Sequence, residues 1–201
     1  MLSVENKIVK YVSTCKKGEI ILPEDLSKLG TSEAVRLALF RLERKDFLVR
    51  LAHGIYLYPE VDDILGVLYP SLEEVAEAIA RRDKARIIPT GVQSLNKLGL
   101  STQIPMNVVY LTDGASRDIK VGKSSIKFKR TTPKNLAVKG KISGLVIQAL
   151  RAIGKENITP SVVKKISNLL AKEKPDKLAY DAQLAPAWIR KIMLDTVKQN
   201  A

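Results

Sequence analysis

The N-terminal part of the chain alternates between helical and extended hydrophobic patterns. Apolar positions at helical spacing, after a Ser3 that suits an N-cap, predict a helix over residues 3–15. A short β-branched run at residues 19–22 predicts a strand. Pro23 suits the opening of a second helix around residues 24–29, because proline is tolerated in the first turn of a helix.

The clearest helical pattern follows next. Its apolar stripe recurs at positions i, i+3, i+4 and i+7 and consists of Val35, Ala38, Leu39 and Leu42. Thr31 or Ser32 is in position to cap this helix, and the pattern ends at Lys45. The stripe predicts that one face of the helix packs on a core and that the other face meets solvent.

An extended pattern comes after this third helix. Residues 47–51 and 55–58, joined by a turn at residues 52–54, predict a β-hairpin. Helix, short strand, helix, capped helix and hairpin is the element order of a winged helix-turn-helix. In that fold the third helix enters the DNA major groove and the hairpin forms the wing. We therefore predict a DNA-binding domain over residues 1–60.

Residues 61–201 predict a second, mixed α/β domain with a small sheet and a helical C-terminal part. Residues 62–70 are expected to form a connection, and Ser71 caps a helix that ends in a basic run. Strands are predicted over residues 87–89 and 108–111, a short helix over 91–98, a hairpin over 119–121 and 125–129, and helices over 142–153, 161–171 and 187–198. The fold class is therefore α+β.

Charge changes this picture because it is strongly positive and unevenly distributed. The chain has 34 Lys and Arg against 21 Asp and Glu, a net charge of +13, which favours a polyanionic partner. Residues 1–60 carry ten basic and eight acidic side chains, which gives +2, whereas the rest carries 24 against 13, which gives +11. The second domain is therefore also expected to face a polyanion or an acidic partner.

The solvent face of the third helix carries the candidate base-reading residues. Arginine has a planar fork that matches guanine O6 and N7, and the start of the helix is the part that reaches base edges. We predict that Ser32, Arg36 and Arg41 read bases. Arg44 and Lys45 are expected to contact phosphates. The alternative is a solvated helix face with no ligand.

The turn of the predicted wing offers two further cationic candidates. Arg50 and His53 bracket this turn, where they can reach the DNA backbone or the minor groove. For His53 a surface hydrogen bond is the alternative. His53 is the only histidine of the chain, which excludes any site that needs two imidazoles.

A second basic cluster lies in the predicted second domain. It consists of Lys120, Lys123, Lys127, Lys129, Arg130 and Lys134. Strand alternation places Lys120, Lys127 and Lys129 on one outer face of the hairpin, opposite Ile126 and Phe128. These lysines are expected either to bind a polyanion or a partner, or to protect the edge of the sheet.

The sequence lacks the motifs of an enzyme site. It has no phosphate-cradling glycine loop, no Cys or His metal cluster and no nucleophile elbow, so we expect no catalytic residue, no cofactor and no metal. The single Cys15 is expected to pack as a small apolar residue. No signal peptide and no membrane-spanning stretch are evident, so we expect a cytoplasmic protein.

Five segments carry a resemblance to a known family. They are residues 32–42 and 50–56 in the first domain, and residues 98–105, 109–114 and 185–188 in the second. In these segments the sequence resembles the AbiEi-type antitoxins of type IV toxin-antitoxin and phage-defence systems. The resemblance implies a winged-helix repressor that binds an inverted repeat in its own promoter. It also implies a C-terminal domain that counteracts a nucleotidyltransferase toxin, directly or indirectly.

Two other functions stay open at this point. One is a nucleotide-dependent enzyme that modifies the partner toxin, for which the sequence offers no motif. The other is a basic RNA-binding protein, which fits the charge but lacks aromatic residues interleaved for base stacking.

Overall fold

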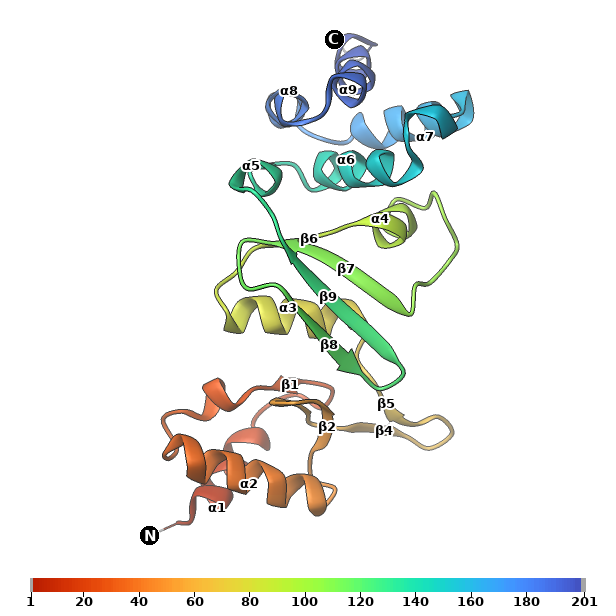
Figure 1. Cartoon of the computed structure of the whole chain (residues 1–201). Coiled ribbons are helices and arrows are strands. Elements are labelled where there is room, and N and C mark those ends of the chain that lie inside the picture. The colour runs from red at the N-terminus through yellow and green to blue at the C-terminus, as the bar shows by residue number, and fades with distance from the viewer. Residues whose placement is uncertain (1, 200–201) are drawn as a thin grey trace. The chain divides into compact units, whose positions relative to one another are not determined.

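The computed structural model describes residues 2–199 and confirms the α+β fold class. The chain, traced in Figure 1, forms two compact units. The first unit comprises Met1–Lys84 and Ile119–Ser124, and the second comprises Ala85–Asp118 and Ser125–Ala201. The helix that follows Ser71 therefore belongs to the first unit, although the sequence placed it beyond a boundary at residue 60.

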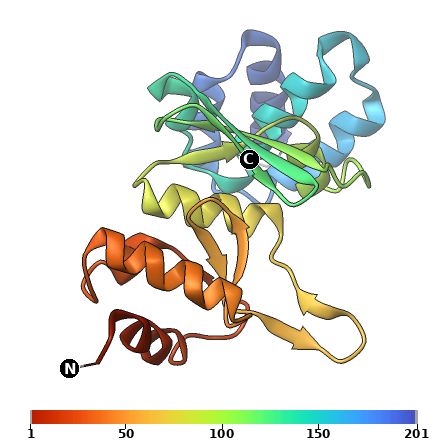
Figure 2. The same cartoon turned by 60° about the horizontal axis from the view of Figure 1, so that its bottom comes forward.

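The first unit begins with the elements of a winged helix-turn-helix. In chain order these are α1 (Val4–Val12), β1 (Ile20–Ile21), the 3-10 helix η1 (Pro23–Leu26), α2 (Ser32–Arg44), β2 (Val49–Ala52) and β3 (Ile55–Leu57). The strands form an antiparallel sheet in the order β1-β3-β2. Helices α1 and α2 lie side by side (Figure 2). Their N-caps are Ser3, whose Oγ accepts from Asn6 N at 3.2 Å, and Thr31, whose Oγ1 accepts from Ala34 N at 3.3 Å.

The apolar stripe of α2 packs into the core of this domain, as predicted. Its neighbours there include Ile8, Val12, Leu26, Leu48 and Tyr56, which come from α1, η1 and the strand region. Fully burying one Val, Leu or Ile side chain stabilises a fold by about 1.5–3 kcal/mol. The stripe therefore fixes the rotation of α2 about its axis, which leaves the opposite face exposed.

Two helices of this unit are shorter than predicted. The helix expected over residues 24–29 is a single 3-10 turn. Pro23 opens that turn, and the Asp25 carboxylate accepts a hydrogen bond from Leu22 N at 3.0 Å, so the turn closes on its own N-terminus. The first helix ends at Val12, before the predicted end at residue 15, and the chain continues there in turns.

The segment predicted as a connection contains a second hairpin. Its strands are β4 (Glu60–Asp62) and β5 (Gly66–Leu68), which pair antiparallel. The Asp62 carboxylate holds the turn by accepting hydrogen bonds from Ile64 N at 2.8 Å and Leu65 N at 2.9 Å. This hairpin extends away from α1 and α2 (Figure 2). Its pattern was missed because neither of its faces is buried, so no core imposes an alternation of polar and apolar residues.

The predicted helix after Ser71 is α3 (Leu72–Arg82). Ser71 and Glu74 form a capping box, in which Ser71 Oγ accepts from Glu74 N at 3.2 Å and Glu74 Oε2 accepts from Ser71 N at 2.7 Å. Ser71 Oγ also donates to Glu74 Oε2 at 2.8 Å, and this bond, together with the one from Ser71 N, lowers the pKa of the Glu74 carboxyl. The start of α3 is therefore set by local sequence.

The second unit contains most of the predicted small sheet, apart from Ile119–Ser124, which belongs to the first unit. The strands of the sheet are β6 (Ile87–Pro89), β7 (Asn107–Thr112), β8 (Arg117–Val121) and β9 (Ser124–Arg130), in the order β6-β7-β9-β8, and helix α4 (Gly91–Lys97) follows β6. Strand β7 pairs parallel with β9 and antiparallel with β6. On β9, Ile126 and Phe128 are buried whereas Lys127 and Lys129 are exposed, which confirms the predicted faces of this strand.

Helices complete the second unit. They are α5 (Pro133–Leu136), α6 (Lys141–Ile153), the 3-10 helix η2 (Lys155–Asn157), α7 (Pro160–Leu170), α8 (Pro175–Leu184) and α9 (Ala187–Gln199). The sequence did not predict α8, because the buried face of α8 includes Asp181, which interrupts the apolar stripe. The Asp181 carboxylate accepts hydrogen bonds from Lys139 N and Gly140 N, both at 2.8 Å, and from Ser143 Oγ. It therefore fixes the segment that leads into α6, whose first-turn amide Ile142 N donates to Glu173 Oε2 at 2.9 Å.

Candidate nucleic-acid interface

The exposed face of α2 is the foundation of the candidate site. Ser32, Arg36, Phe40, Arg41 and Arg44 are all exposed, as the apolar stripe predicted. A helix turns by about 100° per residue, so Arg36 and Arg41 lie roughly 140° apart around its axis. They cannot face the same neighbour, and the structure places them on different edges of the exposed face.

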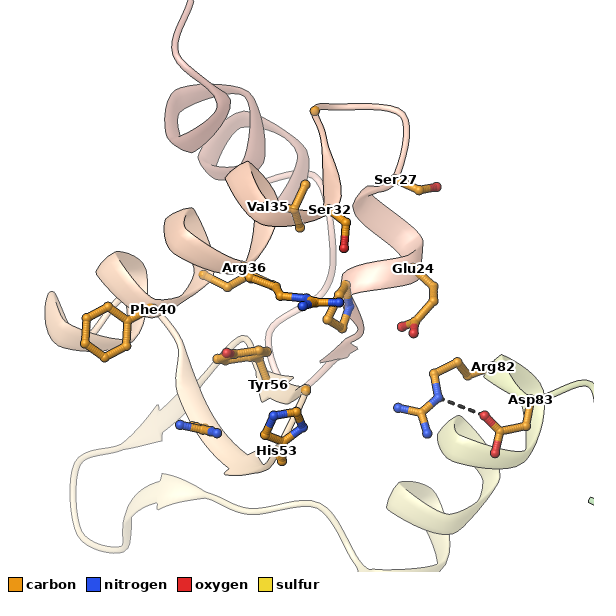
Figure 3. A pocket seen from close by; sticks show the side chains of 15 residues that line it. Glu24, Ser27, Ser32, Val35, Arg36, Phe40, His53, Tyr56, Arg82 and Asp83 are labelled. Atoms are coloured by element: carbon orange, nitrogen blue, oxygen red, sulfur yellow. Dashed lines mark hydrogen bonds and ion pairs between the residues drawn. The ribbon is translucent and has the colours of Figure 1, made fainter. Parts of the chain in front are cut away.

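One edge of α2 borders a hollow of about 760 Å³ within the first unit (Figure 3). The side chains that form it come from η1, α2, the β2–β3 hairpin and the end of α3. Among the predicted site residues, Ser32, Arg36, Arg50 and His53 line this hollow. The structure therefore brings four of the seven predicted DNA-binding residues together.

Arg36 is the central cation of the hollow. Figure 3 shows its side chain reaching across the space above Tyr56 and His53. Within the described residues its guanidinium has neither a hydrogen-bond nor an ion-pair partner. All five N–H groups of Arg36 are therefore available to an external acceptor.

The β2–β3 hairpin supplies the second side of the hollow. Its pairing shifts register between Arg50 and Ala52, and Gly54 has a φ of 68°, a left-handed conformation that glycine adopts without strain. The tight turn holds Arg50 and His53 beside the hollow. Arg50 Nη1 lies 4.0 Å from Glu43 Oε2, at the limit of an ion pair, so Arg50 is only weakly neutralised.

Tyr56 on β3 adds a hydroxyl to the lining of the hollow. Burial raises the pKa of the Tyr56 phenol, although the nearby Arg50 guanidinium partly opposes this effect. The hydroxyl therefore stays protonated at neutral pH. It can donate a hydrogen bond to an anionic ligand in the hollow.

The other edge of α2 faces α1 and carries two predicted residues away from the hollow. Arg41 Nη1 lies 3.9 Å from Glu5 Oε2, and Lys45 Nζ makes a short hydrogen bond with Glu5 Oε1. Arg44 lies over the ring of Phe40, with 5.9 Å between its Cζ and the ring centroid. None of the three lines the hollow with Arg36. Arg41 and Lys45 lie roughly 140° and 180° from Arg36 around the helix axis, whereas Arg44 lies about 80° around it but roughly 12 Å further along.

Sequence reasoning missed five polar residues that line the hollow, namely Glu24, Ser27, Tyr56, Arg82 and Asp83. Glu24 comes from η1, and Arg82 and Asp83 come from the end of α3. Arg82 Nε donates to Asp83 Oδ1 at 2.9 Å, so this pair is internally neutralised. Local sequence indicated a basic end of α3, but no signal along the chain placed that end beside α2.

The second basic cluster is spread over three elements of the structure. Lys120 lies on β8, Lys127, Lys129 and Arg130 on β9, and Lys134 on α5, while Lys123 lies in the turn between β8 and β9. Lys127 Nζ donates to Asp118 Oδ2 at 3.1 Å, which places Asp118 on the same outer face. Lys120 and Lys129 are exposed and have no ion-pair partner in the described part of the chain.

The described residues offer no other arrangement with evident chemistry. Across residues 2–199, no three His, Cys, Asp or Glu side chains gather as a metal-ion site. Burial raises the pKa of the Cys15 thiol, and neighbouring carboxylates add to this effect, so the nucleophilic thiolate is disfavoured. In the same described range, no helix has the length and apolar character needed to span a membrane.

Comparison with known proteins gives a family and a fold. The model of a family of unknown function (DUF6088) matches residues 7–178. No curated protein matches the chain. Among solved structures, the crystal structure of the RV2827C protein from Mycobacterium tuberculosis is similar, with a TM-score of 0.50 and 13% sequence identity over 96% of this chain and 82% of that chain. At this identity the likeness supports the fold alone.

Proposed function

We propose that this chain, which belongs to the DUF6088 family, is a DNA-binding antitoxin and autorepressor. Its winged helix binds an inverted repeat in its own promoter, and its second unit counteracts a nucleotidyltransferase toxin. The observation that carries the DNA-binding proposal is the convergence of Arg36, Arg50 and His53 around one hollow beside the exposed face of α2.

In this proposal different residues contact the bases and the phosphates of DNA. Arg36 lies in the first half of α2, the half that reaches base edges when a recognition helix enters the major groove. Its unpaired fork suits bidentate hydrogen bonds to guanine O6 and N7. Arg50 on β2 and His53 in the β2–β3 turn border the same hollow, where we place the phosphate contacts, and the hydroxyls of Ser32 and Tyr56 add neutral donors.

The state of Arg36 favours this proposal over a merely solvated helix face. Exposed ion pairs contribute little to stability. The other cations at this helix nevertheless have internal partners: Arg41 and Lys45 lie beside Glu5, and Arg44 lies over the Phe40 ring. Arg36 has none within the described residues, although Glu24 lines the same hollow. A cation that is held in a concave site without an internal partner is suited to an external anion.

The DNA-binding half is tested with duplex DNA from the chain's own promoter region. We expect Arg36→Ala to weaken specific binding by about 1–3 kcal/mol, which is roughly a 5-fold to 150-fold rise in Kd. Arg41→Ala is the matched control on the same helix, and it should change Kd much less because Arg41 faces Glu5. Fluorescence anisotropy and footprinting measure both. Equal losses in the two variants, or stronger competition by RNA than by duplex DNA, would contradict the proposal.

The antitoxin half is supported by the resemblance and by charge. The excess of +11 beyond residue 60 exceeds what a DNA-binding function confined to the winged helix requires. The test is co-expression with a neighbouring nucleotidyltransferase gene and a measurement of growth. Wild-type protein and Arg36→Ala should both rescue growth, since Arg36 lies outside the second unit. Loss of rescue in Arg36→Ala at equal protein level would argue against a division of functions between the units.

A further inference from the structure

The β4–β5 hairpin presents an apolar tip to solvent. Ile64 is 92% exposed and Leu65 is 75% exposed, and Val61 and Tyr69 nearby are exposed as well. The hydrogen bonds to the Asp62 carboxylate hold Ile64 and Leu65 in one turn conformation. An ordered, protruding pair of large apolar side chains is a feature of interaction sites, because solvated surfaces rarely gather such residues.

The charge of this hairpin indicates the kind of partner. Residues 59–70 contain three carboxylates, those of Glu60, Asp62 and Asp63, and no Lys or Arg. The rest of the chain carries 34 basic against 18 acidic side chains, since 21 minus these three leaves 18. The backbone hydrogen bonds from Leu65 and Ile64 lower the pKa of the Asp62 carboxyl, so it is ionised at neutral pH. DNA is repelled by such a segment, whereas a basic protein surface attracts it.

A suitable basic surface exists on this chain, on the outer face of β8 and β9. We call the exposed residues Lys120, Lys127 and Lys129 the lysine face. Asp118, whose Oδ2 accepts from Lys127 Nζ at 3.1 Å, lies on the same face, so three positive charges stand there against one negative charge. Lysine stems are apolar over most of their length, so a row of them can cover Ile64 and Leu65 while the ammonium groups meet carboxylates. Two hairpins would repel one another, because each carries three negative charges. Complementarity therefore favours the hairpin of one copy against the lysine face of another.

We propose that the β4–β5 hairpin is a self-association arm that docks on the lysine face of a second copy of this chain. In a two-fold pair each copy gives its hairpin and receives its partner's, so the contact forms twice and the assembly closes. Each contact then needs to supply only about half of the roughly 1,200 Å² that specific interfaces bury. The proposal does not rest on DNA binding, and the experiments below use protein alone except for one control.

The first test is association of the full-length protein by analytical ultracentrifugation. We expect wild type to form a dimer that weakens at high salt, because the contact joins opposite charges. Ile64→Ser/Leu65→Ser should raise the dimer Kd by about tenfold or more, since it removes the apolar tip. Ile104→Ser is the matched control, because Ile104 is 86% exposed but lies in the second unit. A wild-type protein that is monomeric across the concentration range would overturn the proposal, as would equal effects of the tip variant and the control.

The second test identifies the partners by charge exchange. Glu60→Lys/Asp63→Lys keeps Asp62 and its turn, and should abolish the dimer. Lys120→Glu/Lys129→Glu should do the same, and mixing the two variants should restore a heterodimer. Carbodiimide cross-linking of a mixture of isotope-labelled and unlabelled wild-type protein should join hairpin carboxylates to these lysines between labelled and unlabelled chains. Cross-links found only within single chains, or failure of the mixture to associate, would overturn the proposal.

A third measurement separates the lysine face from DNA. If its three lysines contact phosphates instead, their neutralisation should flatten the plot of log affinity against log salt by about 0.9 per lost contact, or roughly 2–3 units. We expect the slope per bound chain to stay unchanged in the triple glutamine variant. A flattened slope with unaltered self-association would overturn the proposal, and it would leave the role of Arg36 intact.

Discussion

The two hairpins of the first unit are neighbours in sequence but opposite in surface chemistry. In the β2–β3 hairpin, Ile55 and Leu57 are fully buried, and the turn carries Arg50 and His53 beside the hollow of α2. In the β4–β5 hairpin every residue of β4 is exposed, and the turn carries carboxylates and an apolar tip. Antiparallel pairing of two short strands is thus common to both, whereas burial and charge are not.

The two hairpins also differ in what supports them. A two-stranded ribbon is marginal in water, so it needs a sheet, a helix or a partner to be stable. The β2–β3 hairpin obtains this support from β1, which pairs with β3, and from the core. The β4–β5 hairpin has no third strand in the described structure and relies on the Asp62 turn. We propose a polyanion as the ligand of the first hairpin and a basic protein surface as the ligand of the second.

The largest expected effect concerns stability. Ile55→Ala removes a fully buried side chain from the β2–β3 hairpin and should lower the free energy of unfolding of the first unit by about 2–5 kcal/mol. Val61→Ala makes a similar change in the β4–β5 hairpin, where Val61 is 60% exposed, and should cost less than about 0.5 kcal/mol. Urea denaturation followed by circular dichroism measures both. Similar losses would show that the second hairpin is also part of the folded core.

A smaller effect is expected on DNA binding. Arg50→Ala should weaken binding by about 1 kcal/mol and reduce the salt slope by about 0.9, because one phosphate contact is lost. Asp63→Ala in the other hairpin should leave the salt slope unchanged, since we place that hairpin off the DNA. Anisotropy titrations at several salt concentrations provide the measurement. If Asp63→Ala alters the slope as much as Arg50→Ala does, the assignment of the two hairpins to different ligands is wrong.

The smallest effect is a local response to acid in the β4–β5 turn. Hydrogen bonds from Leu65 N and Ile64 N hold the pKa of the Asp62 carboxyl below its ordinary value. The stabilisation of the turn is therefore present above the ordinary aspartate pKa and is lost as the pH falls through the lower native pKa. The amide resonances of Ile64 and Leu65 should titrate with a midpoint below the ordinary aspartate value. Asp62→Asn should abolish this titration, and a midpoint at or above the ordinary value would contradict the role of the turn.

Local sequence was sufficient to predict the winged-helix elements and the exposure of the candidate residues on α2. The α2 stripe of Val35, Ala38, Leu39 and Leu42 determined the exposed face, and with it the exposure of Arg36. The hairpin turn at Arg50 and His53 followed from the extended pattern on both sides of a glycine. These features depend on interactions between residues close in sequence and on one buried face, which a single sequence records.

The packing of segments far apart in the sequence determines which exposed cations lie near one another. Glu5 on α1 pairs with Lys45 and lies 3.9 Å from Arg41, and the end of α3 places Arg82 beside the hollow. Neither outcome is visible in the pattern of α2 itself. The β4–β5 hairpin was likewise invisible, because an element without a buried face leaves no hydrophobic period in the sequence. Local patterns were enough to predict most elements and the exposed face of α2, but not α8 or the β4–β5 hairpin. Only the packing of distant segments decided the neighbours of each face, because ion pairs and hollows depend on distances in space.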